Sequence, residues 1–337
     1  MATAAAAPAP AQHARSRFTQ PGWRRRQLPI VFAWVLVIAL FFIVSLFEPG
    51  FRSNANIRSI VDQSMILGVV ALGQTLVIIA RGIDLSVPSM MAVAGVVVAR
   101  HGTATGDVLG ALLVIVPIAL GLGLLNGISV AVLRAPAIIV TLATNTLVLG
   151  ALLVSTAGGT SQTGGQVPPI FRTLATGEVG PIPVSGLVWL GVAIFATLLM
   201  SATRFGRHVY AVGNNPLAAR LSGVSVIRTT VAVYVISSLC AAVGGLLLAG
   251  YLNQSFPSMG GTYLFTSIAV VLIGGASILG GSGHYLGTVA GALTLSVLGG
   301  VLAILDLGPA YLRILYGVLI FLTVGVGTVL AGRGRTE

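Results

Sequence analysis

Long, continuous apolar runs separated by short charged or glycine-rich breaks make up most of the chain. A helix needs about 20 apolar residues to cross the hydrocarbon core of a membrane, whereas the strands of a membrane barrel alternate apolar and polar residues. No Asp, Glu, Lys or Arg occurs between Arg228 and Asp306, a stretch long enough for about three helical crossings. The pattern predicts an all-α integral membrane protein with about ten transmembrane helices, at residues 28–47, 64–80, 85–100, 108–132, 137–155, 186–202, 229–250, 263–279, 286–305 and 312–331.

Composition and charge agree with a membrane location. Hydrophobic residues make up 56% of the chain and charged residues 7%, whereas a soluble domain has about 25% charged residues, so a water-soluble fold is excluded. The net charge of +11 does not indicate nucleic-acid binding, because the arginines occupy short breaks between apolar runs. With both termini in the cytoplasm the positive-inside rule is satisfied, since the only arginines on the outer side are Arg52, Arg58, Arg100, Arg172 and Arg313.

The N-terminal apolar run is expected to stay in place as the first transmembrane helix. Three arginines at 24–26 precede it, as in a secretory signal peptide. A signal peptide has an apolar region of about 7–15 residues and a cleavage site with small residues, whereas this run is longer and ends at Glu48, Pro49 and Gly50. The chain is therefore divided into a disordered cytoplasmic tail at 1–27, a transmembrane domain at 28–331 and a short cytoplasmic tail at 332–337.

Two loops are longer than a turn. The outer loop, at about 156–185, is rich in Gly, Pro, Thr and Ser and offers a surface on which a partner could dock. The cytoplasmic loop at 201–228 is different, because its apolar residues recur at helical spacing: Val212, Leu217, Leu221 and Val224. Pro216 suits the first turn of a short amphipathic helix, Asn214 or Asn215 its N-cap, and Gly223 its end. A short helix in a cytoplasmic loop needs a partner to pack against.

Two groups of polar residues are candidates for a solute path. The first is the segment Gly82-Ile83-Asp84-Leu85-Ser86-Val87-Pro88-Ser89, which lies between two apolar runs. Asp84 either caps the following helix, which is the preferred interpretation because Arg81 lies beside it, or lines a path at a helix broken inside the membrane, together with Ser86. The second group comprises Thr141, Thr144 and Asn145, which share one face of a helix and could bond sugar hydroxyls or a neighbouring helix.

The chain carries little that could support catalysis. It has no paired carboxylates, no Ser-His-Asp set and no Walker sequence, so we expect no enzymatic activity and no ATP hydrolysis by this chain alone. Its four histidines are far apart and its single Cys240 lies in an apolar run, so no metal site is expected. Many glycines are interpreted as sites of close helix packing, and a faint similarity between 78–94 and 271–290 suggests an internal duplication.

Several stretches resemble one family of transporters, the ribose-type permeases of ABC importers. The longest is Thr203-Arg204-Phe205-Gly206-Arg207-His208-Val209-Tyr210-Ala211-Val212-Gly213-Asn214-Asn215-Pro216-Leu217-Ala218-Ala219-Arg220-Leu221-Ser222-Gly223-Val224, which is similar to the cytoplasmic coupling loop of that family. Gly82–Ser86, Pro136–Leu142, Ile273–Gly275 and Gly280–Gly283 resemble further stretches in the same order. Arg81 and Pro88 depart from the pattern, since glycine often stands there in the family.

The resemblance implies a function and a set of partners. It implies a bacterial inner-membrane permease that forms a dimer, with a second copy as the expected partner, and receives a sugar-like solute from a periplasmic binding protein. Cytoplasmic ATPase subunits, which use ATP and Mg, would drive it by binding the coupling loop; this chain would itself hold no cofactor. The residues implied in ATPase coupling are Gly213, Asn214, Asn215, Pro216, Ala218, Ala219, Arg220 and Gly223.

Two other functions are weighed against the sugar importer. A branched-chain amino-acid ABC permease usually lacks the stretch from Gly213 to Arg220 and the segment Ile83–Ser86. An ion-coupled secondary transporter should carry several ionisable residues inside the membrane, and only Asp84 meets that condition here. The sequence therefore favours the sugar importer.

Overall fold

The computed structural model describes residues 21–102, 107–156, 167–308, 310–318 and 321. This part of the chain is almost entirely helical. The elements are α1 (Pro21–Phe47), the 3-10 helix η1 (Pro49–Arg52), α2 (Asn54–Ile79), α3 (Val87–Gly102), α4 (Val108–Ala131), α5 (Ala137–Ser155), α6 (Pro169–Thr176), β1 (Glu178–Val179), β2 (Ile182–Pro183), α7 (Val184–Ala202), α8 (Arg204–Asn214), α9 (Pro216–Leu221), α10 (Val226–Leu252), α11 (Tyr263–Ile273) and α12 (Tyr285–Ile304).

The predicted all-α membrane architecture is confirmed at the level of seven candidate spans among the described residues. These are α2, α4, α5, α7, α10, α12 and the part of α1 from Leu28 to Phe47, each long and apolar enough to cross a membrane. Residues 21–27, predicted as part of a tail, are helical and belong to α1. Residues 310–318 are also helical, but most of the predicted helix at 312–331 and the predicted tails at 1–20 and 332–337 lie outside the described residues.

Several predicted helices have different bounds in the structure. The helix predicted at 64–80 begins ten residues earlier, at Asn54, because the Ser53 hydroxyl caps it by accepting from the backbone N–H of Asn56. The helix predicted at 85–100 is shifted by two residues, since α3 begins at Val87 and ends at Gly102, and the helix predicted at 263–279 is shorter, since α11 ends at Ile273. Each adjoins a non-helical segment, at 80–86 and at 274–284, which we call the α2–α3 break and the α11–α12 break.

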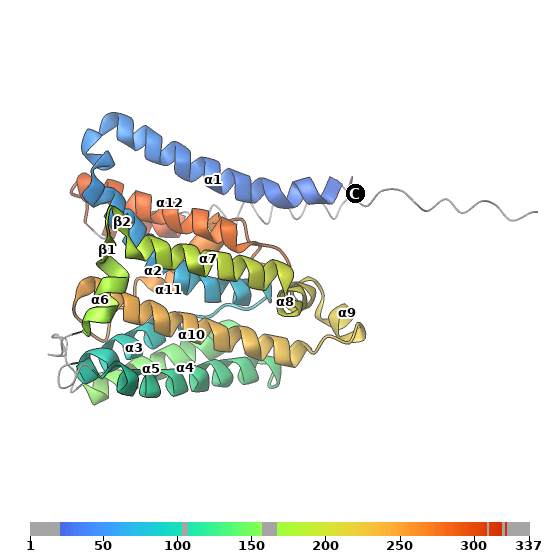
Figure 1. Ribbon diagram of the computed structural model, residues 1–337. Helices are drawn as coiled ribbons and strands as arrows, with labels where there is room; N and C mark the ends of the chain where they lie inside the picture. The colour runs from blue at the N-terminus through green and yellow to red at the C-terminus, as the bar shows by residue number, and fades with distance from the viewer. Residues whose placement is uncertain (1–20, 103–106, 157–166, 309, 319–320, 322–337) are drawn as a thin grey trace, which may run out of the picture.

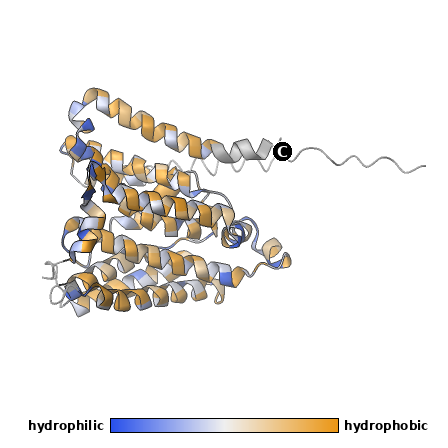
Figure 2. Cartoon of the chain, in the orientation of Figure 1, coloured by the Kyte–Doolittle hydropathy of each residue, from blue (hydrophilic) through white to orange (hydrophobic). Residues whose placement is uncertain are grey.

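The long helices run side by side between two polar ends (Figure 1). The cytoplasmic loop predicted at 201–228 forms α8 and α9, which lie together at one end; α6 and the hairpin of β1 and β2 lie at the opposite end. Hydropathy follows this division, because apolar residues cover the lengths of the helices and hydrophilic residues gather at the two ends (Figure 2). Below we call these the α9 end and the hairpin end.

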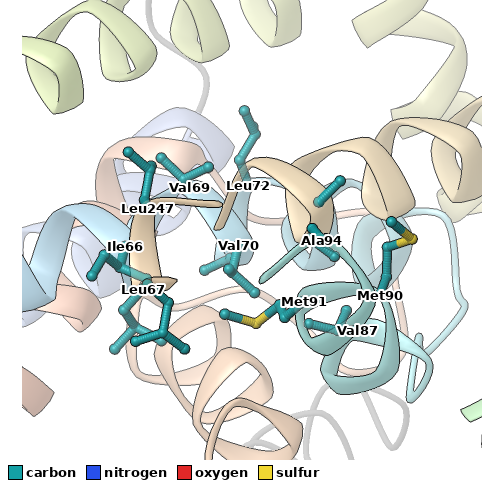
Figure 3. Close-up of a cluster of buried hydrophobic side chains, with 14 of the residues drawn as sticks. Ile66, Leu67, Val69, Val70, Leu72, Val87, Met90, Met91, Ala94 and Leu247 are labelled. Carbon is teal, nitrogen blue, oxygen red and sulfur yellow. The ribbon is translucent and has the colours of Figure 1, made fainter. Parts of the chain in front are cut away.

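Helices α2 and α10 form the centre of the bundle. The apolar window of α2 is 94% buried, compared with 17% for α1, so α2 is enclosed by protein while α1 presents its side chains outward. α10 packs against α4, α2 and α3. Figure 3 shows part of the core where α2, α3 and α10 meet, with Val70 of α2 beside Met91 of α3 and Leu247 of α10 in the same cluster. The outward side chains of α1, α4, α5 and α7 are mostly apolar, as a surface that faces lipid requires.

The hairpin end is held by polar contacts between elements distant in sequence. Arg58 of α2 forms an ion pair with Glu178 of β1, and the Ser185 hydroxyl of α7 donates to the carboxylate of Asp62. The outer loop predicted at 156–185 is therefore not a plain loop in its described part, since it contains α6 and the hairpin. Residues 157–166 of that loop lie outside the described residues.

Candidate functional site

The α2–α3 break carries Asp84 into the interior of the helix bundle. The Asp84 side chain is only 1% exposed. Its Oδ1 accepts from the backbone N–H and the hydroxyl of Ser86, at 2.9 and 2.6 Å, and its Oδ2 accepts from the hydroxyl of Ser237, at 2.8 Å. Ser237 lies near the middle of α10, so the carboxylate is inside the layer that the long helices span.

A chain of hydrogen bonds continues from Ser86 to α4 and α5. The amide of Asn126 donates to the Ser86 hydroxyl at 2.8 Å and accepts from the Thr144 hydroxyl at 2.7 Å. The hydrogen bonds run in one direction, from the Thr144 hydroxyl through Asn126 and Ser86 to the Asp84 carboxylate, and these bonds offset the cost of desolvating buried polar groups. The chain connects the α2–α3 break with α4 and α5.

Two further contacts tie α5 to the same region. The Thr141 hydroxyl donates to the carbonyl of Ile83 at 3.2 Å, and the Asn145 side-chain oxygen accepts from the backbone N–H of Ser89 at 3.1 Å. All the side chains concerned are buried. We refer to these residues as the polar cluster: Asp84, Ser86, Ser89, Asn126, Thr141, Thr144, Asn145 and Ser237.

The structure brings together all five residues proposed for a solute path: Asp84, Ser86, Thr141, Thr144 and Asn145. They bond one another and neighbouring helices, and their role in a path stays a prediction. Asp84 is not an N-cap of α3 in the strict sense, because it binds Ser86, the residue directly before the helix, rather than the helical N–H groups. Sequence reasoning missed Asn126 and Ser237, although each is a polar residue within an otherwise apolar run.

The cytoplasmic loop predicted at 201–228 forms two short helices, α8 and α9, rather than one. The predicted local signals of α9 are confirmed: the Asn215 side chain caps the helix by accepting from Leu217 and Ala218, Pro216 is its first residue, and Gly223 follows its end with a φ of +82°. The helix α8 was not predicted. Its N-cap is Thr203, whose hydroxyl accepts from the backbone N–H of Gly206.

The predicted apolar face of this loop is divided between the two helices. Val212 of α8 is buried against the bundle, whereas Leu217 and Leu221 of α9 are 67% and 81% exposed. Among the residues implied in ATPase coupling, Gly213 and Ala219 are buried and Pro216 is partly buried, while the following are exposed: Asn214, Asn215, Ala218, Arg220 and Gly223. α9 thus presents apolar side chains outward at a polar end of the molecule.

Three segments meet where α8 ends. The guanidinium of Arg81 donates to the carbonyls of Gly213 and Asn214, at 2.6 and 2.7 Å. The Asn214 amide donates to the carbonyl of Gly281 at 3.2 Å, and the backbone N–H of Gly281 donates to the carbonyl of Ile79 at 2.9 Å. These five residues join the end of α8 to both breaks, and we call them the junction: Ile79, Arg81, Gly213, Asn214 and Gly281.

Close packing at the junction requires glycine at position 213. A β-carbon at Gly213 would overlap the carbonyl oxygen of Ile79 and lie 2.7 Å from the backbone nitrogen of Gly281. The interpretation of glycines as sites of close packing is supported elsewhere too, since a β-carbon at Gly123 of α4 would lie 2.5 Å from the Cα of Val235 in α10. At Gly213 the neighbours are backbone atoms of two other segments, which cannot move aside as a flexible side chain would.

The histidines and the cysteine do not form a site in the described part of the chain. No group of three or more His, Cys, Asp or Glu that could hold a metal ion occurs there. His208 is exposed on α8, and the ring of His284 caps α12 by accepting from the backbone N–H of Leu286. Cys240 is a half-buried free thiol of α10.

Comparison with known proteins gives consistent results. A model of the family described as "Branched-chain amino acid transport system / permease component" matches residues 56–324. The ribose import permease RbsC of Haemophilus influenzae is 34% identical over 87% of this chain and 91% of the relative, and RbsC of Escherichia coli K12 is 33% identical over 91% and 95%. The galactose/methyl galactoside import permease MglC of Haemophilus influenzae is 30% identical over 88% and 93%. No solved structure matches.

These matches confirm the resemblance to ribose-type permeases that the loop from Thr203 to Val224 indicated. They cover nearly the whole chain rather than that loop alone, and both the polar cluster and the junction fall within the matched range. Together with the seven candidate spans, they place the protein in the bacterial inner membrane. The chain belongs to the family of branched-chain amino acid transport system permease components.

Proposed function

We propose that this chain is the membrane-spanning permease subunit of an ATP-driven ABC importer, which moves a sugar-like solute delivered by a periplasmic binding protein. Its relatives named for sugars support the solute class, although the family description names amino acids. One observation carries the mechanism. α9 is a capped helix at a polar end of the molecule that exposes Leu217 and Leu221, and exposed apolar side chains of this kind mark a surface that another protein covers.

The partner at α9 is a cytoplasmic ATPase subunit. The chain itself has no Walker sequence to hold a nucleotide, so ATP and Mg belong to the partner. The exposed coupling residues Asn214, Asn215, Ala218 and Arg220 would form the rest of this contact. A second copy of the chain completes the transport unit, since one bundle packs its centre tightly around α2 and α10.

The topology has ten crossings with both termini in the cytoplasm, and the α9 end faces the cytoplasm. Helix α3 alone is about 24 Å long at 1.5 Å per residue, a few ångströms short of a membrane core about 30 Å thick. The extended α2–α3 break adds more than this difference, so the break and α3 together are long enough for one crossing. Arginines support the orientation, because Arg207 and Arg220 belong to α8 and α9 and the Arg81 side chain bonds the end of α8.

The test is transport by the complete importer in proteoliposomes. The chain is reconstituted with its ATPase subunit, the binding protein is added outside, and uptake of labelled ribose, galactose and leucine is measured with and without ATP inside. Expected is ATP-dependent uptake of a sugar that also requires the binding protein. An ATPase subunit unable to hydrolyse ATP serves as the control and should abolish uptake.

Two results would contradict the proposal in different ways. ATP-dependent uptake of leucine alone would keep the importer and replace the solute class. Uptake that persists without ATPase subunits and follows a proton or sodium gradient would instead indicate a secondary transporter, with the buried Asp84 as its ionisable group.

A further inference from the structure

Arg81 holds a backbone conformation that suits glycine rather than arginine. Its φ is +69°, in the left-handed region. Its N–H bonds the carbonyl of Ile78 at 3.0 Å and the N–H of Gly82 bonds that of Val77 at 2.8 Å, the pattern with which helices end in a Schellman motif. A left-handed conformation is unfavourable for a residue other than glycine. Such a residue persists where surrounding contacts hold it, and these contacts suggest a function.

The contacts that hold Arg81 are at the end of another helix. Its guanidinium donates to the carbonyls of Gly213 and Asn214, the last two residues of α8. The last carbonyls of a helix have no partner within the helix and carry a partial negative charge. A cationic side chain there donates the missing hydrogen bonds and offsets the charge. Arg81 therefore caps α8 from a different segment, 132 residues away in sequence.

From Arg81 the chain leads directly to the polar cluster. Gly82 packs against Tyr234 of α10, and the Ile83 carbonyl accepts from Thr141 of α5. Asp84 follows, with both oxygens bonded. Three residues of extended chain span about 10 Å. Since both of its ends are held, this segment can transmit a displacement of α8 to the inside of the bundle.

A second connection from α8 takes another route. Asn214 bonds Gly281, and the Tyr210 hydroxyl donates to the carbonyl of Gly283 at 2.7 Å. Both contacts lead to the α11–α12 break and not to the polar cluster. The end of α8 thus has two arms. The Arg81 side chain packs against Gly280, where an added β-carbon would overlap its Cγ, but its hydrogen bonds to Gly213 and Asn214 belong to the first arm alone. A change at Arg81 therefore removes the side-chain hydrogen bonds of one arm and leaves those of the other.

We propose that Arg81 is a positioning residue for transport, which couples the end of α8 to the α2–α3 break so that movement of the ATPase-binding segment reaches Asp84. This inference rests on the proposed function, because it requires an ATPase that moves α8 and α9. Coupling between sites within a protein is typically about 1–3 kcal/mol, or about 5- to 150-fold.

The key variant is Arg81→Gly. Glycine suits the left-handed backbone, so α2 should still end normally and the protein should insert and assemble with its ATPase. Uptake per ATP hydrolysed in the reconstituted importer should fall about fivefold or more. Arg81→Lys keeps a positive charge and a single donor nitrogen that can reach the same carbonyls, and should restore about half of the coupling.

Arg134→Gly is the matched control. Arg134 is also an arginine in the left-handed region, with a φ of +56°, and it is exposed beyond the end of α4. No side-chain hydrogen bond joins it to another residue in the described part of the chain. The control removes the same charge and the same backbone strain, and uptake per ATP should not change.

Hydrogen exchange distinguishes coupling from a structural effect. Binding of a non-hydrolysable ATP analogue to the wild-type importer should change deuterium uptake in peptides covering 211–215, 82–89 and 280–284. In Arg81→Gly the changes at 211–215 and 280–284 should persist, while the change at 82–89 is lost. General destabilisation would instead raise exchange in all three peptides before the analogue is added.

The outcomes separate this inference from the proposed function. A wild-type importer without ATP-dependent uptake contradicts the proposed function itself. If wild-type uptake needs ATP but Arg81→Gly keeps the wild-type ratio of uptake to ATP and the exchange response at 82–89, the role of Arg81 is wrong and the importer stands. An equal loss in Arg134→Gly would also overturn the role, because it would assign the effect to charge at the α9 end.

Discussion

The polar cluster and the junction are both built from hydrogen bonds between segments distant in sequence, but in different ways. In the polar cluster buried side chains bond mainly one another, as Asp84, Ser86 and Asn126 do. In the junction the acceptors are backbone carbonyls, and two of the donors, Arg81 and Asn214, are exposed residues. A buried group left without its partner costs the full free energy of desolvation, whereas an exposed group can turn to water.

This difference assigns different tasks to the two regions. Disruption of the polar cluster should lower the free energy of unfolding, because no water replaces the lost partners. Disruption at the exposed side of the junction should leave stability nearly unchanged and reduce the transmission of movement from α8. The variants below test this comparison, from the largest expected change to the smallest.

Asp84→Ala should be the most destabilising. It removes the acceptor of three hydrogen bonds and leaves the hydroxyls of Ser86 and Ser237 buried without it. We expect the free energy of unfolding to fall by about 3 kcal/mol, measured by thermal unfolding in detergent. Asp84→Asn keeps an acceptor oxygen and nearly the same shape, so it should lose less than half as much.

Equal stability of Asp84→Ala and the wild type would contradict this view of the polar cluster. It would mean that water reaches the site and replaces the carboxylate, which is the condition that a solute path needs. Asp84→Ala would then be expected to alter uptake without altering stability, and the path interpretation of Asp84 would gain support.

Much of the fold could be predicted from the sequence where a single segment contains the whole reason for its structure. α5 has the bounds predicted for it, because a helix in lipid must satisfy its own backbone and stay apolar throughout. The start and end of α9 were also predicted, since an Asn cap, a Pro in the first turn and a Gly at the end act within a few residues.

The sequence did not predict the structure of segments whose hydrogen-bond partners lie on distant parts of the chain. The α2–α3 break can remain non-helical inside the bundle because its groups bond Ser237 and Thr141, which lie on other helices. Local periodicity does not contain these partners, so the sequence favours Asp84 as a cap of the following helix. The first ten residues of α2 were missed for a similar reason, since polar residues there pair with the hairpin and α7, as Arg58 and Asp62 do.

Gly213→Ala tests the tight side of the junction. The added methyl group would overlap backbone atoms of Ile79 and Gly281, and overpacking of this kind costs about 1–3 kcal/mol. We expect the α8 end to shift and ATP-driven uptake to fall at least tenfold, with membrane insertion intact, as measured in proteoliposomes and by membrane fractionation. Gly150→Ala in α5 is the control, because nothing lies within 4 Å of its added carbon, and it should transport normally.

Ala218→Asp tests the exposed face of α9 without touching the bundle. Ala218 is exposed beside Leu217, so a carboxylate there should leave thermal stability unchanged and weaken binding of the ATPase subunit by about 1–2 kcal/mol, roughly ten- to thirtyfold. Co-purification and uptake should fall together. Ala218→Ser adds a polar group without charge and should retain both. Loss of uptake with an intact ATPase complex would move the effect from docking to a later step.

The smallest effect is expected at His284, which precedes α12 at the α11–α12 break. Its ring Nδ1 accepts from the backbone N–H of Leu286, so the cap requires the neutral ring, and burial lowers the pKa of His284. The unfolded chain therefore binds a proton more readily than the folded chain as the pH falls through about 6.5, and stability should decrease slightly below that pH. His284→Asn supplies a cap that does not titrate, and its melting temperature should fall less than that of the wild type between pH 8 and about pH 5.5. If both proteins show the same decrease in melting temperature, protonation of a group other than His284 is responsible. If only the wild type loses both stability and uptake, the α11–α12 break is the acid-sensitive arm of the α8 end, distinct from the arm that Arg81 supplies.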